Sequence, residues 1–161
     1  MYQIVDTNVL LVASKKAPQA SETCELSCEK YLQNLMKGGI LVIDSQWLII
    51  KEYMNKNSQS GQPNAGDKFL KWVLLNHTNP DRCDKVTITK ISENNFAEFP
   101  KSESLEKFDP SDRKFVAVAI THQAKPAIAN AVDSDWRNHE QALREHGVEL
   151  NFLCPELAAK K

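Results

Sequence analysis

The chain lacks the long hydrophobic runs of a membrane protein. None of its apolar stretches approaches the roughly 20 residues that a helix needs to cross a bilayer. The opening residues, MYQIVDTNVLL, carry no basic segment ahead of their apolar stretch, which is not the pattern of a signal peptide. We therefore expect a cytoplasmic protein with no membrane partner.

Several kinds of functional motif are also missing. No glycine-rich phosphate loop is present, which excludes P-loop and dinucleotide-binding proteins. The four histidines are scattered and suggest no catalytic triad. The net charge of −1 argues against a dedicated clamp for nucleic acid, which usually has a strongly basic face. It does not exclude a nuclease, because bound cations can bridge protein carboxylates to phosphate.

Cysteine is scarce, with four residues at positions 24, 28, 83 and 154. In a cytosolic chain of this size we expect them to be free thiols. Cys24 and Cys28 are four residues apart in a helical pattern and can share one helix face. Two thiols alone do not complete a zinc site, so the sequence predicts no structural metal there.

Hydrophobic and polar segments alternate in a way that predicts an α/β fold. The length of 161 residues suits one domain, which we assign to residues 1–155, followed by a flexible basic tail at 156–161. Strands alternating with helices favour a three-layer α/β/α arrangement around a mainly parallel sheet of about five strands. We expect strands at 3–6, 40–43, around 85–92, at 127–132 and at 148–153. We expect helices at 8–14, from Ser21 to Gly38, from Ser45 through Tyr53, at 67–76, from Asp109 through Ala119 and from Asp133 to Gly147.

Acidic residues follow the predicted strands in an informative way. Asp6 and Asp133 each end a strand, and Asp112 lies in the first turn of a helix. Ligands of open α/β sheets bind at the carboxyl ends of the strands, where these acids can meet. Each acid alone also fits a helix-capping role, which carboxylates commonly fill. Several of them in one cleft would repel one another unless a cation such as Mg²⁺ or Mn²⁺ lay between them.

Glu52 has a different setting from the other acids. It lies inside a predicted helix, next to Ile49, Ile50 and Tyr53. An acid beside an apolar stripe is usually solvated at its edge. If Glu52 instead points inward, it needs a partner or a metal ion.

Four segments, taken in order, resemble the motifs of the PIN-domain family. They are IVDTNVLL, WLIIKEY, DRKFVAVAI and AVDSDW, and together they span nearly the whole chain. The resemblance implies an endoribonuclease that uses Mg²⁺ or Mn²⁺ to cleave single-stranded RNA. It assigns catalysis and metal binding to Asp6, Glu52, Asp112 and Asp133, with Asp135 as an alternative ligand to Asp133.

The resemblance also implies supporting roles around these acids. Thr7 and Asn8 would orient Asp6 or a bound water, and Asp109 is a further candidate beside Asp112. The family often has a threonine where this chain has Ala131, so Asn130 or Ser134 is expected to replace its hydroxyl. Many bacterial members are toxins, so an antitoxin, another protein partner or a second copy of the chain is a candidate partner. The 92–108 loop, longer than compact toxins need, argues against the toxin role.

Basic and aromatic residues near the motifs are candidates for substrate binding. Basic residues can contact the phosphates of a nucleic acid, although each of them can equally be a solvated surface residue without a role in binding. The candidates are Lys15, Lys51, Arg113, Lys114 and Arg137. The tryptophans at 47, 72 and 136 are expected in the core rather than stacked on bases.

Two other functions compete with a nuclease. The first is a non-catalytic PIN-like module that acts through a protein partner. The second is a phosphatase with Asp6 as nucleophile. That chemistry commonly needs a second aspartate two positions later, where this chain has Asn8.

Overall fold

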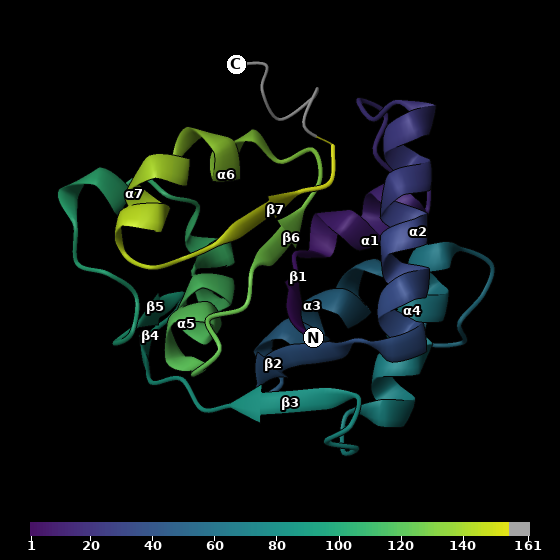
Figure 1. Ribbon diagram of the computed structural model, residues 1–161, viewed down its shortest axis with the longest axis horizontal. Helices are drawn as coiled ribbons and strands as arrows, with labels where there is room; N and C mark the ends of the chain where they lie inside the picture. Colours follow the sequence, from purple (N-terminus) through teal and green to yellow (C-terminus); the bar gives the residue numbers. More distant parts are fainter. Residues whose placement is uncertain (155–161) are drawn as a thin grey trace.

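Figure 1 shows the computed structural model of the protein, which describes residues 1–154. The predicted basic tail at 156–161 lies outside the described residues. The strands are β1 (Tyr2–Val5), β2 (Ile40–Asp44), β3 (Cys83–Val86), β4 (Lys90–Ser92), β5 (Asn95–Phe96), β6 (Ile128–Asn130) and β7 (Leu150–Phe152). The helices are α1 (Thr7–Ala13), α2 (Glu22–Gly38), α3 (Leu48–Lys56), α4 (Ala65–Asn76), α5 (Arg113–Thr121), α6 (Ser134–Asn138) and α7 (Glu140–Glu145), with short 3₁₀ turns η1 (Glu103–Leu105) and η2 (Pro110–Asp112).

The central sheet has five parallel strands in the order β3-β2-β1-β6-β7. Helices α1, α2 and α4 pack together on one side of it, and α5 lies on the other (Figure 1). This arrangement confirms the predicted three-layer α/β/α fold. A small antiparallel hairpin, β4–β5, lies beside α5 (Figure 1).

The first strand occupies the centre of the sheet. β1 pairs with β2 on one side and with β6 on the other, with Ile4 opposite Ile128. Ile4, Val5, Ile128 and Ala129 are fully buried, as expected for strands that helices cover on both faces. Because the strands are parallel, the residues that follow them collect at one edge of the sheet.

The observed boundaries differ from the predictions at several places. The prediction of one strand around 85–92 is wrong, because β3 in the central sheet ends at Val86 and β4 of the hairpin begins at Lys90. The helix expected from Asp109 starts with the 3₁₀ turn η2 and is α-helical only from Arg113, and the helix expected from 67 begins at Ala65.

Two further differences concern the helices after Asp44 and after Asp133. The helix predicted to begin near Ser45 begins at Leu48, because Trp47 adopts a left-handed conformation with φ of 69°. The Asp44 carboxylate accepts the backbone N–H groups of Leu48 and Ile49, each at 2.9 Å, and so caps this helix. The single helix predicted after Asp133 is two short helices, α6 and α7, separated at His139.

The prediction of four free thiols is wrong for two of them, because Cys24 and Cys154 form a disulfide. Helix α2 brings Cys24 against the segment after β7, with the two Cα atoms 5.3 Å apart, a separation that suits a disulfide. Cys28 and Cys83 are free and buried. The partners are 130 positions apart, so only the folded arrangement pairs them.

No helix within residues 1–154 combines the length and the apolar character needed to cross a membrane.

Candidate metal centre

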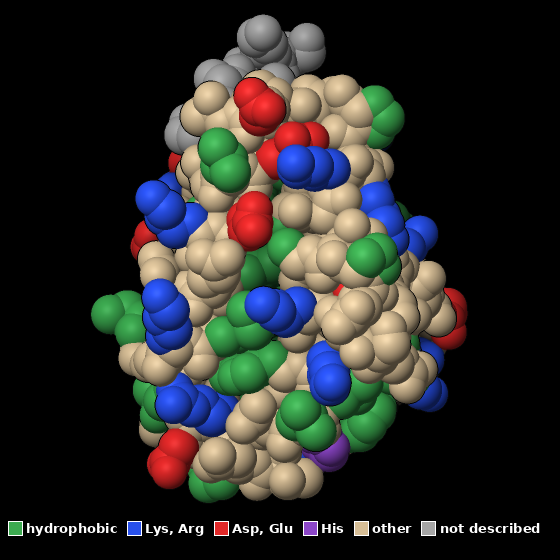
Figure 2. Space-filling view, turned by 90° about the vertical axis from the view of Figure 1, so that its right-hand side faces the viewer, with side chains coloured by type: hydrophobic (Ala, Val, Ile, Leu, Met, Phe, Trp, Pro, Cys, Tyr) green, Lys and Arg blue, Asp and Glu red, His purple; other side chains and the backbone are tan. Residues whose placement is uncertain are grey.

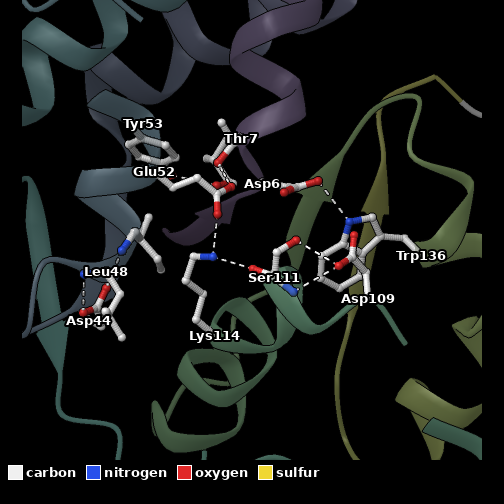
Figure 3. Close-up of polar contacts among 12 residues, drawn as sticks. Asp6, Thr7, Asp44, Leu48, Glu52, Tyr53, Asp109, Ser111, Lys114 and Trp136 are labelled. Atoms are coloured by element: carbon white, nitrogen blue, oxygen red, sulfur yellow. Dashed lines mark hydrogen bonds and ion pairs between the residues drawn. The ribbon is translucent and has the colours of Figure 1, made fainter. Parts of the chain in front are cut away.

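Acidic side chains converge at the carboxyl edge of the sheet. Oxygen atoms of Asp6, Glu52 and Asp112 lie within 4.8 Å of one another, and so do those of Asp109, Asp112 and Asp133. Asp112 belongs to both groups, so the structure joins them into one acid cluster made of these five residues. They come from four separate segments of the chain, and Figure 3 labels three of them, Asp6, Glu52 and Asp109.

Asp6 is held by partners from two other segments. Its Oδ2 atom accepts hydrogen bonds from the Asn8 side-chain amide and, at 3.0 Å, from the indole N–H of Trp136 (Figure 3). The side-chain oxygen of Asn8 accepts the backbone N–H of Ala131 at 2.9 Å. Asn8 therefore connects the end of β1 to the segment that follows β6. Asp6 itself is buried, with only 2% of its surface exposed.

Glu52 points inward and has two partners. The Thr7 hydroxyl donates a hydrogen bond to its Oε2 atom, and Nζ of Lys114 lies 2.5 Å from its Oε1 atom (Figure 3). Lys114 also donates a hydrogen bond to the carbonyl of Ser111. The Lys114 side chain is only 9% exposed, so an ammonium group lies at the border of the acid cluster. Thr7 thus contacts Glu52 in the structure, whereas the sequence suggested a role beside Asp6.

Asp112 is buried in the cluster, and the pKa of its carboxyl group is raised even further than that of Asp6. It is 5% exposed, and its buried Oδ2 atom has no hydrogen-bond partner among the described residues. Burial, followed by the neighbouring Asp6 and Asp133 carboxylates, raises the pKa of Asp112 to about 10. Burial and the Asp133 carboxylate raise the pKa of Asp6 to about 8, against the opposing hydrogen bond from Trp136. Both residues therefore retain protons near neutral pH when no cation balances them.

These features fit a hard divalent cation. A buried carboxylate oxygen without a partner is uncommon and calls for a missing ligand or ion. The donor set consists of carboxylate oxygens, which Mg²⁺ and Mn²⁺ prefer. Asp112 shares one group with Asp6 and Glu52 and a second with Asp109 and Asp133. Glu52 is already paired with Lys114, and the Asp133 carboxylate raises the pKa of both Asp6 and Asp112, so Asp6, Asp112 and Asp133 are the acids best placed to hold such an ion.

The choice between Asp133 and Asp135 as ligand is informed by their contacts. Asp133 is half-buried and accepts the backbone N–H of Asp135 at 3.0 Å, which caps α6. The Asp135 carboxylate accepts the backbone N–H of Asp109 at 2.9 Å and lies 3.3 Å from Nδ1 of His139. These contacts favour Asp133 as the ligand and Asp135 as the residue that fixes the Asp109 turn.

The remaining polar candidates surround the acid cluster less closely. Asp109 accepts the backbone N–H and the hydroxyl of Ser111, at 3.0 and 2.9 Å, and so caps η2. Asn130 is fully buried, and its amide donates a weak hydrogen bond to the Ile128 carbonyl at 3.3 Å. Ser134 is exposed. Within residues 1–154, no hydrogen bond joins Asn130 or Ser134 to the acid cluster.

The two arginine candidates have partners within the protein. The Arg113 guanidinium donates hydrogen bonds to the Asn95 side chain at 3.1 Å and to the Glu106 carbonyl at 3.0 Å. Arg137 lies over the Phe152 ring, 3.9 Å from its centroid, and pairs with Glu140 at 2.8 Å. These contacts favour structural roles for both arginines.

The other basic candidates are exposed lysines. Lys15 and Lys51 are exposed. On the face shown in Figure 2, lysine and arginine side chains lie among acidic and hydrophobic ones. This mixture on the face shown agrees with the net charge of −1.

Trp136 is a site residue that the sequence analysis did not identify as one. The prediction of a core position is confirmed, because Trp136 is fully buried, but its hydrogen bond to Asp6 was not anticipated. The only local signal was its place within AVDSDW, close to two acids. Trp47 and Trp72 are partly buried against the core.

The arrangement as a whole supplies the carboxylate oxygens that a hard divalent cation prefers as ligands. Carboxylates from separate elements meet at the edge of a parallel sheet, which is the usual ligand-binding edge of such folds. An ammonium group, Lys114, lies beside them. In the comparisons with protein-family models, curated proteins and solved structures, none of the three found a match to this chain.

Proposed function

We propose that the chain is a nuclease of the PIN-like type that uses Mg²⁺ or Mn²⁺ to hydrolyse phosphodiester bonds in single-stranded RNA. The observation that carries this proposal is the burial of Asp112 beside Asp6 and Glu52, with its Oδ2 atom unpartnered. Burying several carboxylates together is costly unless a cation compensates them. The order of the four motifs in the sequence supports the same activity, and the choice of RNA rests on that resemblance.

Each residue of the acid cluster has a role that follows from its contacts. Asp6, Asp112 and Asp133 would hold the cation, while Asn8 and Trp136 orient the Asp6 carboxylate. A bound Mg²⁺ or Mn²⁺ supplies a hydroxide nucleophile and neutralises charge on the phosphate.

Lys114 and Glu52 form the other half of the site. The Lys114 ammonium lies beside the acid cluster, and a phosphate oxygen bound next to the cluster would contact it. Glu52 keeps that ammonium in position, and the Thr7 hydroxyl in turn fixes Glu52. Glu52 is therefore proposed as a positioning residue that lies next to the cation.

Cleavage of labelled RNA tests the proposal directly. The full chain is incubated with a single-stranded RNA, or with DNA of the same sequence, in Mn²⁺, in Mg²⁺ or in EDTA. We expect RNA cleavage that needs the cation and is lost in Asp6→Asn and Asp112→Asn. Asp81→Asn is the matched control, because Asp81 is an exposed acid outside the cluster.

Two outcomes would overturn this assignment. If Asp6→Asn and Asp112→Asn cut RNA as fast as the parent chain, the cluster is not the active site. If the parent chain binds Mn²⁺ at the cluster but cleaves neither nucleic acid, it is a binding module with the same fold.

A further inference from the structure

A groove opens directly beside the acid cluster. It lies between α3 and the β4–β5 hairpin and has a volume of about 240 Å³. Lys51 and Asn55 line it from α3, and Lys90 lines it from the hairpin. Glu52 and Lys114 line its inner end, so the groove and the cluster share two residues.

The charges in this groove suit a phosphate. Its lysines are Lys51, Lys90 and Lys114, and its acids are Glu52 and Glu93. Lys114 is held by Glu52, whereas Lys51 forms no ion pair with any described residue. Lys90 lies 3.3 Å from Glu93, but both side chains are exposed, at 44% and 83%. An exposed pair of this kind contributes at most about 1 kcal/mol, so Lys90 can turn to a phosphate at little cost.

The opposite flank of the cluster is unsuited to a polyanion. It carries Asp109 and Asp135, which are linked to each other through the Asp109 backbone. The guanidinium of Arg137, two residues after Asp135, lies over the Phe152 ring and pairs with Glu140. A phosphate chain that leaves the cluster on this side meets acids, whereas on the groove side it meets lysines.

We propose that the single-stranded substrate runs from the acid cluster past Lys114 into this groove, where Lys51 and Lys90 hold a phosphate next to the one that is cleaved. This inference rests on the proposed nuclease function and adds the path of the strand and a second phosphate site. It also selects Lys51 from the exposed lysines that the sequence offered.

Binding without cleavage provides the test. The affinity of the full chain for a fluorescent single-stranded RNA is measured by anisotropy in EDTA, over a series of salt concentrations. Each phosphate contact contributes about 0.7 to the slope of log affinity against log salt for single strands. The double variant Lys51→Gln/Lys90→Gln should therefore reduce the slope by about 0.7, and each single variant should cause part of that loss.

The control has the same change of charge at a distant place. Lys30 is exposed on α2, which lies across the sheet from the hairpin (Figure 1). Lys30→Gln should leave the slope unchanged. An equal loss of slope in this variant would mean that overall charge, and not the groove, sets the affinity, and it would overturn the proposal.

Other outcomes separate this inference from the proposed function. If the parent chain binds no RNA in EDTA, or if the double variant keeps the parent slope, the groove is not a phosphate site even where Mn²⁺-dependent cleavage is present. If the slope falls as expected but no cation supports cleavage, the groove stands and the nuclease assignment fails. If poly-glutamate competes as strongly as RNA, the groove binds acidic peptides and the RNA path is wrong.

Discussion

The indole N–H of Trp136 donates a hydrogen bond of 3.0 Å to Oδ2 of Asp6, across 130 positions of sequence. The bond links the residue after the central strand to helix α6 at the far side of the acid cluster. Such partners fix the orientation of a carboxylate before a cation arrives. Trp136 therefore belongs to the proposed metal centre although it supplies no ligand atom.

Replacing Trp136 by phenylalanine should weaken cation binding. The substitution keeps an aromatic ring but removes the N–H donor, and the loss of such a partner typically reduces metal affinity by about 10–100-fold. Titration with Mn²⁺, followed by electron paramagnetic resonance or calorimetry, measures the change. Trp72→Phe is the control, since Trp72 stacks on Phe69 in helix α4. Equal affinities for the two variants would remove Trp136 from the site.

Asp112→Asn should stabilise the metal-free chain and abolish its response to a cation. Asp112 must take up a proton when the metal-free chain folds, because its pKa is raised to about 10, and asparagine removes that cost. Thermal unfolding with and without Mn²⁺ checks both effects. An ion present at 100 times its dissociation constant should raise the unfolding free energy of the parent by about 2.7 kcal/mol. Asp81→Asn should keep this gain, and an equal gain in Asp112→Asn would contradict the assignment.

The stability of the metal-free chain should fall as pH rises. Burial and neighbouring carboxylates raise the folded-state pKa of Asp112 to about 10 and that of Asp6 to about 8, from an ordinary value of 3.8. Above pH 3.8 the unfolded chain releases these protons while the folded chain keeps them. Each retained proton lowers the unfolding free energy by about 1.4 kcal/mol per pH unit until the folded-state pKa is reached.

Urea unfolding in EDTA at about pH 5 and about pH 8, around the range where such acids differ between states, measures this loss. Asp112→Asn separates it from all other titrations of the chain. The unfolding free energy of the parent minus that of the variant should decrease with pH. A difference that is constant or increases would show that Asp112 is ionised in the folded protein.

Lys114 and Glu52 should prove energetically coupled. Removing either partner leaves the other charge largely buried, at 9% and 23% exposure of their side chains. A double-mutant cycle of Lys114→Met and Glu52→Gln should give a coupling energy of about 0.5–3 kcal/mol by urea unfolding. Lys51→Met, at an exposed position next to Glu52, should change stability by no more than about 0.5 kcal/mol. A coupling energy of zero would mean that the ion pair does not hold Glu52.

The disulfide between Cys24 and Cys154 should contribute measurably to stability. It joins residues 130 positions apart, and bonds that close long loops typically contribute about 2–5 kcal/mol. Reductant should lower the unfolding midpoint of the parent and of Cys83→Ala, but not that of Cys154→Ala. Mass spectrometry of the peptides under non-reducing conditions identifies the bond. If reductant does not change the unfolding midpoint of the parent chain, Cys24 and Cys154 do not form a disulfide in solution.

The fold was predictable because its signals are local. Strands β1 and β2 are short apolar runs that end in Asp6 and Asp44, and α2 begins at a Ser21 cap and ends at Gly38. The carboxyl edge of a parallel sheet is a general binding location, so two site acids could be assigned from their positions alone. The expected convergence of Asp6, Glu52 and Asp112 is present in the structure.

Other features depend on how distant segments pack. The Glu52–Lys114 pair, the Trp136–Asp6 hydrogen bond and the Cys24–Cys154 bond each join separate elements. Hydrophobic periodicity fixes which face of a helix is buried but not which residue it meets. For the same reason Arg113 appeared available for substrate, although the β4–β5 hairpin and the segment before η2 engage its guanidinium.

The central position of β1 has a consequence for the synthesis of this protein. Its partner on one side, β2, emerges from the ribosome soon after it, but β6 and Trp136 follow only much later. Until β6 and α6 have been made, one edge of β1 therefore has no strand partner and Asp6 lacks its bond to Trp136. The acids that follow β1 and β6 cannot meet before β6 and α6 have been made, so the proposed metal centre forms only after those segments have left the ribosome.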